Sequence, residues 1–118
     1  MPMPRRAALG LLALGAGAAR AEPMRLMGST PAARSTMDGN RQEFVLRFDA
    51  PVDHNRSTLA VLRDGQVVRR LHPRLGADPS TLFAIAGDLA PGGYTLRWEA
   101  RSMRDGTATE GDLDFVVR

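Results

Sequence analysis

The chain has 118 residues, enough for one domain, and carries 16 arginines and no lysine against 13 acidic residues. It contains no cysteine, which excludes disulfides, thiolate metal sites and cysteine nucleophiles. The formal net charge of +3 does not indicate a nucleic-acid-binding protein, because arginines are not interleaved with aromatic side chains and three of them lie at the start of the chain.

The first 21 residues have the pattern of a secretory signal. Arg5 and Arg6 precede an apolar run over residues 7–18, and residues 19–21 fit a small-residue cleavage site. The run is shorter than the roughly twenty residues that span a bilayer, so we expect a cleaved leader. The paired arginines also fit twin-arginine export. Removal of the leader would leave 16 − 3 = 13 arginines and 13 acidic residues in a domain over residues 22–118.

The first half of that domain predicts short strands. Residues 25–27 are expected to form an edge strand that ends before Pro31, since proline cannot donate to a ladder. Residues 33–41 are polar and small and predict a loop. Residues 43–48 predict a half-buried strand, because large apolar side chains occupy every second position along it. The apolar set is Phe44, Leu46 and Phe48.

The middle of the chain predicts a hairpin followed by an irregular segment. Two β-rich runs, 58–63 and 66–71, flank the pair Asp64-Gly65. This pair suits a type I′ turn, in which both central residues have positive φ. Residues 72–80 contain two prolines and a glycine and predict an irregular connection, after which residues 82–86 predict another short strand.

The last thirty residues predict a second hairpin. A Pro-Gly-Gly turn at residues 91–93 leads into an alternating run that contains Tyr94 and Trp98, and a second alternating run contains Phe115. We expect Trp98 and Phe115 to face the core. Tyr94 enters its strand directly after the turn and resembles a tyrosine corner, in which the hydroxyl bonds to upstream backbone; the alternative is a half-exposed tyrosine bonded to water.

The whole domain therefore predicts an all-β fold. About seven short strands with turns every eight to twelve residues are typical of a β-sandwich, and no segment after the leader keeps a helical period. Catalysis is not expected, because Ser57, Ser80 and Ser102 lack the context of a nucleophile elbow and only two histidines are present.

The C-terminal pattern resembles a known family. The order Leu-x-Pro-Gly-x-Tyr-x-x-x-Trp over residues 89–98, then Ser102, Asp-Gly at 105–106 and Gly-x-x-x-Phe-x-Val over 111–117, is similar to the C-terminal half of the CopC family of bacterial periplasmic copper-resistance proteins. The resemblance implies a small immunoglobulin-like or cupredoxin-like Greek-key sandwich and a periplasmic location. It also implies a monomer that binds copper ions or delivers them to an inner-membrane copper transporter, without catalysis.

The resemblance implies a Cu(II) site made by the mature amino terminus, a histidine near it, and an Asp-x-His step before the last strand. Asp105 occupies the aspartate position, but Thr107 stands at the second histidine. Cleavage after residue 21 would leave Glu22-Pro23 at the terminus, and Pro23 has no amide hydrogen to lose. Asp105 is therefore the candidate metal ligand on this side, with a plain turn aspartate as the alternative.

Three methionines are the candidate ligands for Cu(I), which prefers soft thioethers. Met24, Met27 and Met103 would meet if the first strand lay beside the Asp105 loop, as the family fold implies. The alternative places Met27 in the core and Met24 loosely on the surface. His54 and His72 lie in predicted loops and are expected to be solvated or hydrogen-bonded.

Two functions follow from these predictions. The first is copper binding or delivery in the periplasm, with copper as Cu(II) or Cu(I). The alternative is a sandwich without metal that serves as an interaction module for an envelope or membrane-transporter partner. The fold does not choose between them, because sites are grafted on folds.

Overall fold

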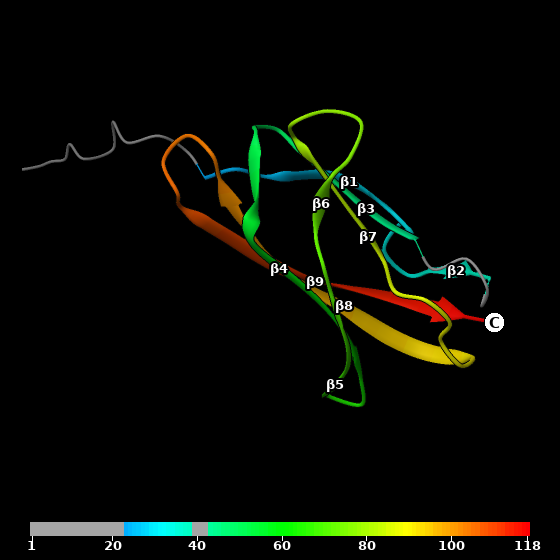
Figure 1. The fold of residues 1–118 in the computed structure, drawn as a ribbon. Coiled ribbons are helices and arrows are strands. Elements are labelled where there is room, and N and C mark those ends of the chain that lie inside the picture. The colour runs from blue at the N-terminus through cyan, green and yellow to red at the C-terminus, as the bar shows by residue number, and fades with distance from the viewer. Residues whose placement is uncertain (1–22, 39–42) are drawn as a thin grey trace, which may run out of the picture.

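The computed structural model describes residues 23–38 and 43–118. These residues form two β-sheets that pack face to face (Figure 1), with strand orders β1-β3-β7-β6 and β2-β9-β8-β4-β5. The predicted all-β sandwich is confirmed. No helix in the described ranges is long and apolar enough to cross a membrane. The predicted leader over residues 1–21 lies outside the described residues.

The described residues contain nine strands, where about seven were expected from the turn spacing. The four-stranded sheet consists of β1 (Leu26–Thr30), β3 (Glu43–Phe48), β6 (Arg74–Leu75) and β7 (Thr81–Ile85). The five-stranded sheet consists of β2 (Ser35–Met37), β4 (Val52–Arg63), β5 (Gln66–Leu71), β8 (Gly92–Ser102) and β9 (Ala108–Val117).

Two short strands, β2 and β6, lie in segments predicted as loops. Strand β2 pairs in parallel with the far end of β9, and β6 pairs with β7. Both are three residues or fewer, and each is defined by a partner elsewhere in the chain. Strand β4 also begins earlier than predicted, because an irregular stretch between Asp53 and Thr58 joins it to the segment that begins at Val52. Each difference depends on a pairing partner outside the segment itself, which the pattern within that segment does not report.

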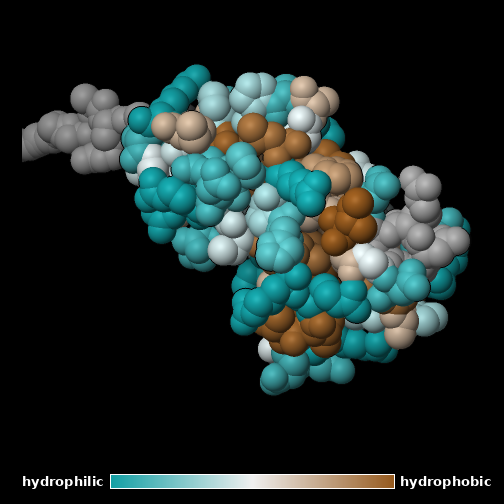
Figure 2. Space-filling model, in the orientation of Figure 1, coloured by the Kyte–Doolittle hydropathy of each residue, from teal (hydrophilic) through white to brown (hydrophobic). Residues whose placement is uncertain are grey.

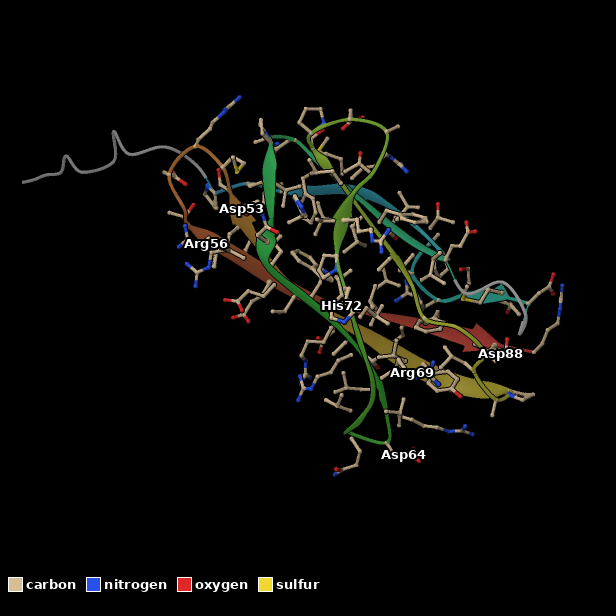
Figure 3. The ribbon with its side chains drawn as sticks, in the orientation of Figure 1. Asp53, Arg56, Asp64, Arg69, His72 and Asp88 are labelled. Carbon is tan, nitrogen blue, oxygen red and sulfur yellow. The ribbon has the colours of Figure 1, made fainter. Side chains whose placement is uncertain are left out.

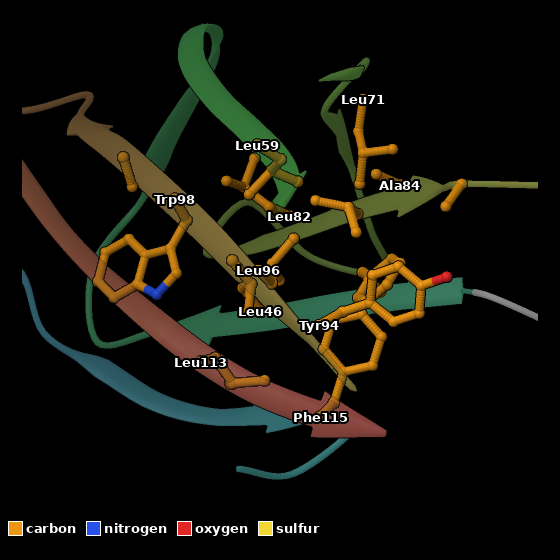
Figure 4. Close-up of a cluster of buried hydrophobic side chains, with 14 of the residues drawn as sticks. Leu46, Leu59, Leu71, Leu82, Ala84, Tyr94, Leu96, Trp98, Leu113 and Phe115 are labelled. Carbon is orange, nitrogen blue, oxygen red and sulfur yellow. The ribbon is translucent and has the colours of Figure 1, made fainter. Parts of the chain in front are cut away.

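Aromatic side chains join the two sheets across the core (Figure 4). The rings of Phe44 and Phe115 have centroids 5.2 Å apart, and those of Phe48 and Trp98 are 5.5 Å apart, both in edge-to-face geometry. Trp98 is 5% exposed and Phe115 is 1% exposed, which confirms the predicted core side of the last hairpin. Trp98 lies over Gly111, since a Cβ on that glycine would stand 2.8 Å from Trp98 Cζ2.

Both predicted turns have the expected geometry. Asp64 and Gly65 have φ values of 52° and 79°, the two positive angles of a type I′ hairpin. At the other turn the Tyr94 hydroxyl donates to the Ala90 carbonyl at 2.6 Å, which confirms the tyrosine corner. Arg63 supports this corner, because its guanidinium donates to the Tyr94 hydroxyl at 3.1 Å and to the Pro91 carbonyl at 3.3 Å.

Strand β5 is one edge of the five-stranded sheet. Val67 and Val68 on it remain partly exposed, and Figure 2 shows apolar surface over the β4–β5 hairpin. Arg69 donates to the carbonyls of Ala86 and Asp88, which ties this edge to the β7–β8 connection. Charged side chains on an edge strand oppose pairing with other chains.

Candidate metal-binding depressions

Asp105 lies in a depression at the end of the sandwich where the described chain begins. The depression has a volume of about 450 Å³, and three segments meet around it: the chain start, the β3–β4 connection and the β8–β9 loop. Its lining residues are Pro23, Met24, Asp49, Ala50, Ser102, Arg104, Asp105 and Thr107. We call it the Asp105 depression.

Hydrogen bonds hold the first described residues of the chain against this depression. The Thr109 hydroxyl donates to the Met24 carbonyl at 2.8 Å. The Arg25 amide donates to Asp49 Oδ1 at 2.8 Å, and the Asp49 amide donates to the Arg25 carbonyl at 3.0 Å. Pro23 is thereby placed in the lining, and residue 22, the expected start of the mature chain, directly precedes it.

Thr107 donates two hydrogen bonds to the Asp105 carboxylate. Asp105 Oδ1 accepts from the Thr107 amide at 3.0 Å and from the Thr107 hydroxyl at 2.8 Å. These bonds favour the charged form and lower the pKa of Asp105 below 3.8. The threonine that stands at the family's histidine position therefore stabilises the turn in which Asp105 takes part, and the role of Asp105 as a metal ligand stays a prediction.

A second carboxylate lies in the same depression. The pKa of Asp49 is also lowered, first by the hydrogen bond from the Arg25 amide and then by the Arg25 guanidinium, whose Nε is 3.5 Å from Asp49 Oδ2. Asp49 and Asp105 are both ionised near neutral pH, with Arg25 and Arg104 beside them. The part of the chain that the structure describes holds no group of three or more histidine, aspartate or glutamate side chains placed to bind a metal.

The three candidate methionines do not share one depression. Met24 is 3% exposed and packs in the core beside the Asp105 depression, whereas Met27 and Met103 are each 61% exposed. The alternative that placed Met27 in the core and Met24 on the surface is wrong. The β1–β3 register shifts between Leu26 and Gly28, so Met27 stands at an irregularity where the inward and outward alternation breaks.

Met103 lines a second depression, of about 370 Å³, together with His54. Its lining residues are Pro51, Val52, Asp53, His54, Asn55, Leu75, Pro79 and Met103. His72 lies elsewhere, in a smaller depression with Phe83 and Ile85. Figure 3 shows His72 well away from Asp53, which lies at the irregular end of β4. No motif or spacing in the sequence connects His54 with Met103.

Comparison with known proteins identifies the family. The model of the CopC domain matches residues 26–118. The chain belongs to the CopC domain family. CopC from Methylosinus trichosporium OB3b has a similar crystal structure, with a TM-score of 0.72 and 28% sequence identity over 80% of this chain and 93% of that one. The predicted resemblance is thus confirmed.

Two further structures share the fold of this CopC-family chain. An engineered protein matches with a TM-score of 0.62 and 16% identity over 91% of this chain and 21% of that one. The titin M3 domain matches with a TM-score of 0.51 and 14% identity over 80% and 96%. Comparison with curated proteins found no match. Membership of the CopC family supports a copper-related function in general, and proteins of this family are periplasmic in general.

Proposed function

We propose that this CopC-family chain is an exported protein of copper homeostasis, which binds copper ions or passes them to an inner-membrane transporter without catalysing a reaction. The mature chain would begin at Glu22 after removal of residues 1–21. The observation that carries the proposal is the family match over residues 26–118. The Asp105 depression supports it, because Pro23, Met24 and Asp105 converge there.

The Asp105 depression offers Cu(II) a poorer set of ligands than the family's site does. A Glu22 amine would supply one nitrogen, and the carboxylates of Asp105 and Asp49 would supply oxygens, which Cu(II) accepts. Imidazole is absent, because Thr107 replaces the histidine and its hydroxyl already donates to Asp105. We therefore expect Cu(II) to bind with lower affinity than at a site with two imidazoles.

The fit of Cu(I) depends on the methionines. Met24 would have to leave well-packed surroundings to bind an ion, which is unfavourable in a close-packed interior. Met27 and Met103 are accessible to an ion, since each is more than half exposed. Met24, Met27 and Met103 therefore remain proposed Cu(I) ligands of unequal accessibility.

The test uses the mature chain from Glu22, titrated separately with Cu(II) and Cu(I) against competing chelators. A ligand at a hundred times its dissociation constant stabilises the native state by about 2.7 kcal/mol, which thermal unfolding followed by Trp98 emission would resolve. Asp105→Asn should weaken Cu(II) binding. Its control is Asp112→Asn, because Asp112 bonds Arg97 at 2.9 Å outside either depression. No stabilisation by either ion would contradict a direct copper role.

The alternative function is a sandwich without metal that contacts an envelope partner or a membrane transporter. One observation favours it. Thr107 stands at the position where a histidine would complete the copper site, and it donates two hydrogen bonds to the Asp105 carboxylate. Failure of copper titration, together with binding of the mature chain to a purified transporter domain in the absence of copper, would support this alternative.

A further inference from the structure

We infer that the depression between β4 and the β8–β9 loop is a binding site for a soft monovalent metal ion, with His54 and Met103 as its ligands. This inference rests on the proposed copper function and assigns the binding of soft monovalent ions to a second site. The site is separate from the Asp105 depression, since the two linings have no residue in common. We call it the His54–Met103 depression.

The turn that carries His54 is fixed by hydrogen bonds. Six residues of β4, from Asp53 to Thr58, face three residues of β8, from Arg101 to Glu99, so β4 contains additional residues here. Asn55 donates its amide to Asp53 Oδ1 at 3.1 Å, and the Ser57 hydroxyl donates to the Asp53 carbonyl at 2.7 Å. Irregularities of this kind re-aim side chains, and here His54 joins the lining of the depression.

Met103 directly follows β8, the strand that pairs with β4. Its amide donates to the Pro51 carbonyl at 3.0 Å, and the preceding residue, Ser102, pairs with Val52. This fixes the backbone of Met103 beside the segment that leads into His54. The side chain stays 61% exposed although it lines the depression, so its sulfur is open to an incoming ion.

The chemistry of the lining favours a soft ion. Neutral imidazole and thioether are ligands for Cu(I), whereas hard divalent ions prefer oxygen. The remaining wall is largely apolar, since Pro51, Val52, Leu75 and Pro79 contribute to it. Isolated exposed methionines are common and need no explanation. Met103 differs from such a residue because an imidazole, that of His54, lines the same depression.

The test is titration of the mature chain with Ag(I), a redox-inert soft ion, and with Cu(I) against a competing chelator. His54→Ala and Met103→Leu should each weaken binding about tenfold or more, because even changes behind a ligand cost that much. The matched control is His72→Ala, which removes an imidazole that lies in a different depression. It should leave the affinity unchanged.

Nuclear magnetic resonance of the wild-type chain gives a second readout that does not depend on a variant folding. Ag(I) should shift the His54 imidazole protons and the Met103 methyl signal together at one equivalent. Unchanged affinity in both variants, or Ag(I) shifts confined to other residues, would overturn the assignment while leaving copper binding intact. If the wild-type chain bound neither soft monovalent ions nor Cu(II), the proposed function itself would be contradicted.

Discussion

The two ends of strand β8 are held by different kinds of contact. At its start, Tyr94 is buried, donates to the Ala90 carbonyl and stacks on Phe115 with ring centroids 5.7 Å apart. At its far end, the loop that follows Ser102 is held by hydrogen bonds between exposed groups, and Met103 projects into solvent.

This difference separates folding from binding. Contacts at the start of β8 remove apolar surface from water, which is the main stabilising contribution in folding. Contacts at the far end exchange bonds to water for bonds within the loop, so their net contribution is small. Side chains around both depressions can therefore change without loss of the sandwich, and a CopC-family fold can persist with an altered ligand set.

The largest expected effect comes from Phe115→Ala. This change removes a ring that contacts both Phe44 and Tyr94, and we expect a loss of about 3–5 kcal/mol in the free energy of unfolding. Urea denaturation followed by Trp98 emission measures it. The control, Val116→Ala on the solvent side of the same strand, should stay within about 0.5 kcal/mol. Equal losses in the two variants would contradict a core anchored at this end.

A smaller effect is expected for Tyr94→Phe. The ring is kept, but the bond to the Ala90 carbonyl and the acceptor for Arg63 are lost, so unfolding should become easier by about 1–2 kcal/mol. Thr95→Val is the matched control, because it removes an exposed hydroxyl bond to Asp114 from the neighbouring position. If the two variants had the same stability, the tyrosine corner would have no special role.

The smallest effect on stability is expected for Thr107→Val. It removes one of the two donors to Asp105, so the pKa of Asp105 should rise toward its ordinary value. Because the folded-state pKa is lowered, Asp105 stabilises the native state above its unfolded pKa, and this contribution is lost as the pH falls through the folded value. The variant should lose less stability on acidification.

Carbon-detected titration of the Asp105 carboxyl group in wild type and in the Thr107→Val variant measures this change. Asp112 provides an internal reference in the same spectra, since its lowered pKa depends on Arg97 and should not move. An unchanged pKa of Asp105 would show that the Thr107 hydroxyl does not govern that carboxylate.

Local patterns predicted the elements that local chemistry governs. The alternation over residues 43–48 matches β3, and the β-rich run over residues 66–71 matches β5. The Asp64-Gly65 pair has the two positive φ angles that its turn needs. The short strands β2 and β6 were not predictable in this way: β2 depends on β9, which is distant in the sequence, and β6 is two residues long and is defined only by its pairing with β7. The same limit applies to the methionines: Leu26 packs against the core and the adjacent Met27 is exposed, at a shift of the β1–β3 register that no local pattern shows.

From the amino-acid pattern alone, the all-β architecture and the core positions of Trp98 and Phe115 could be inferred, since alternation and turn residues act over a few neighbours. The kinship with CopC proteins was inferred separately, from the resemblance of the motif over residues 89–117 to that family. Only the packed structure showed that Met24 and Asp105 line one depression and that His54 and Met103 line another. The physical reason is that a depression is formed by segments from different sheets and loops, and their meeting depends on strand pairing and packing across the whole domain.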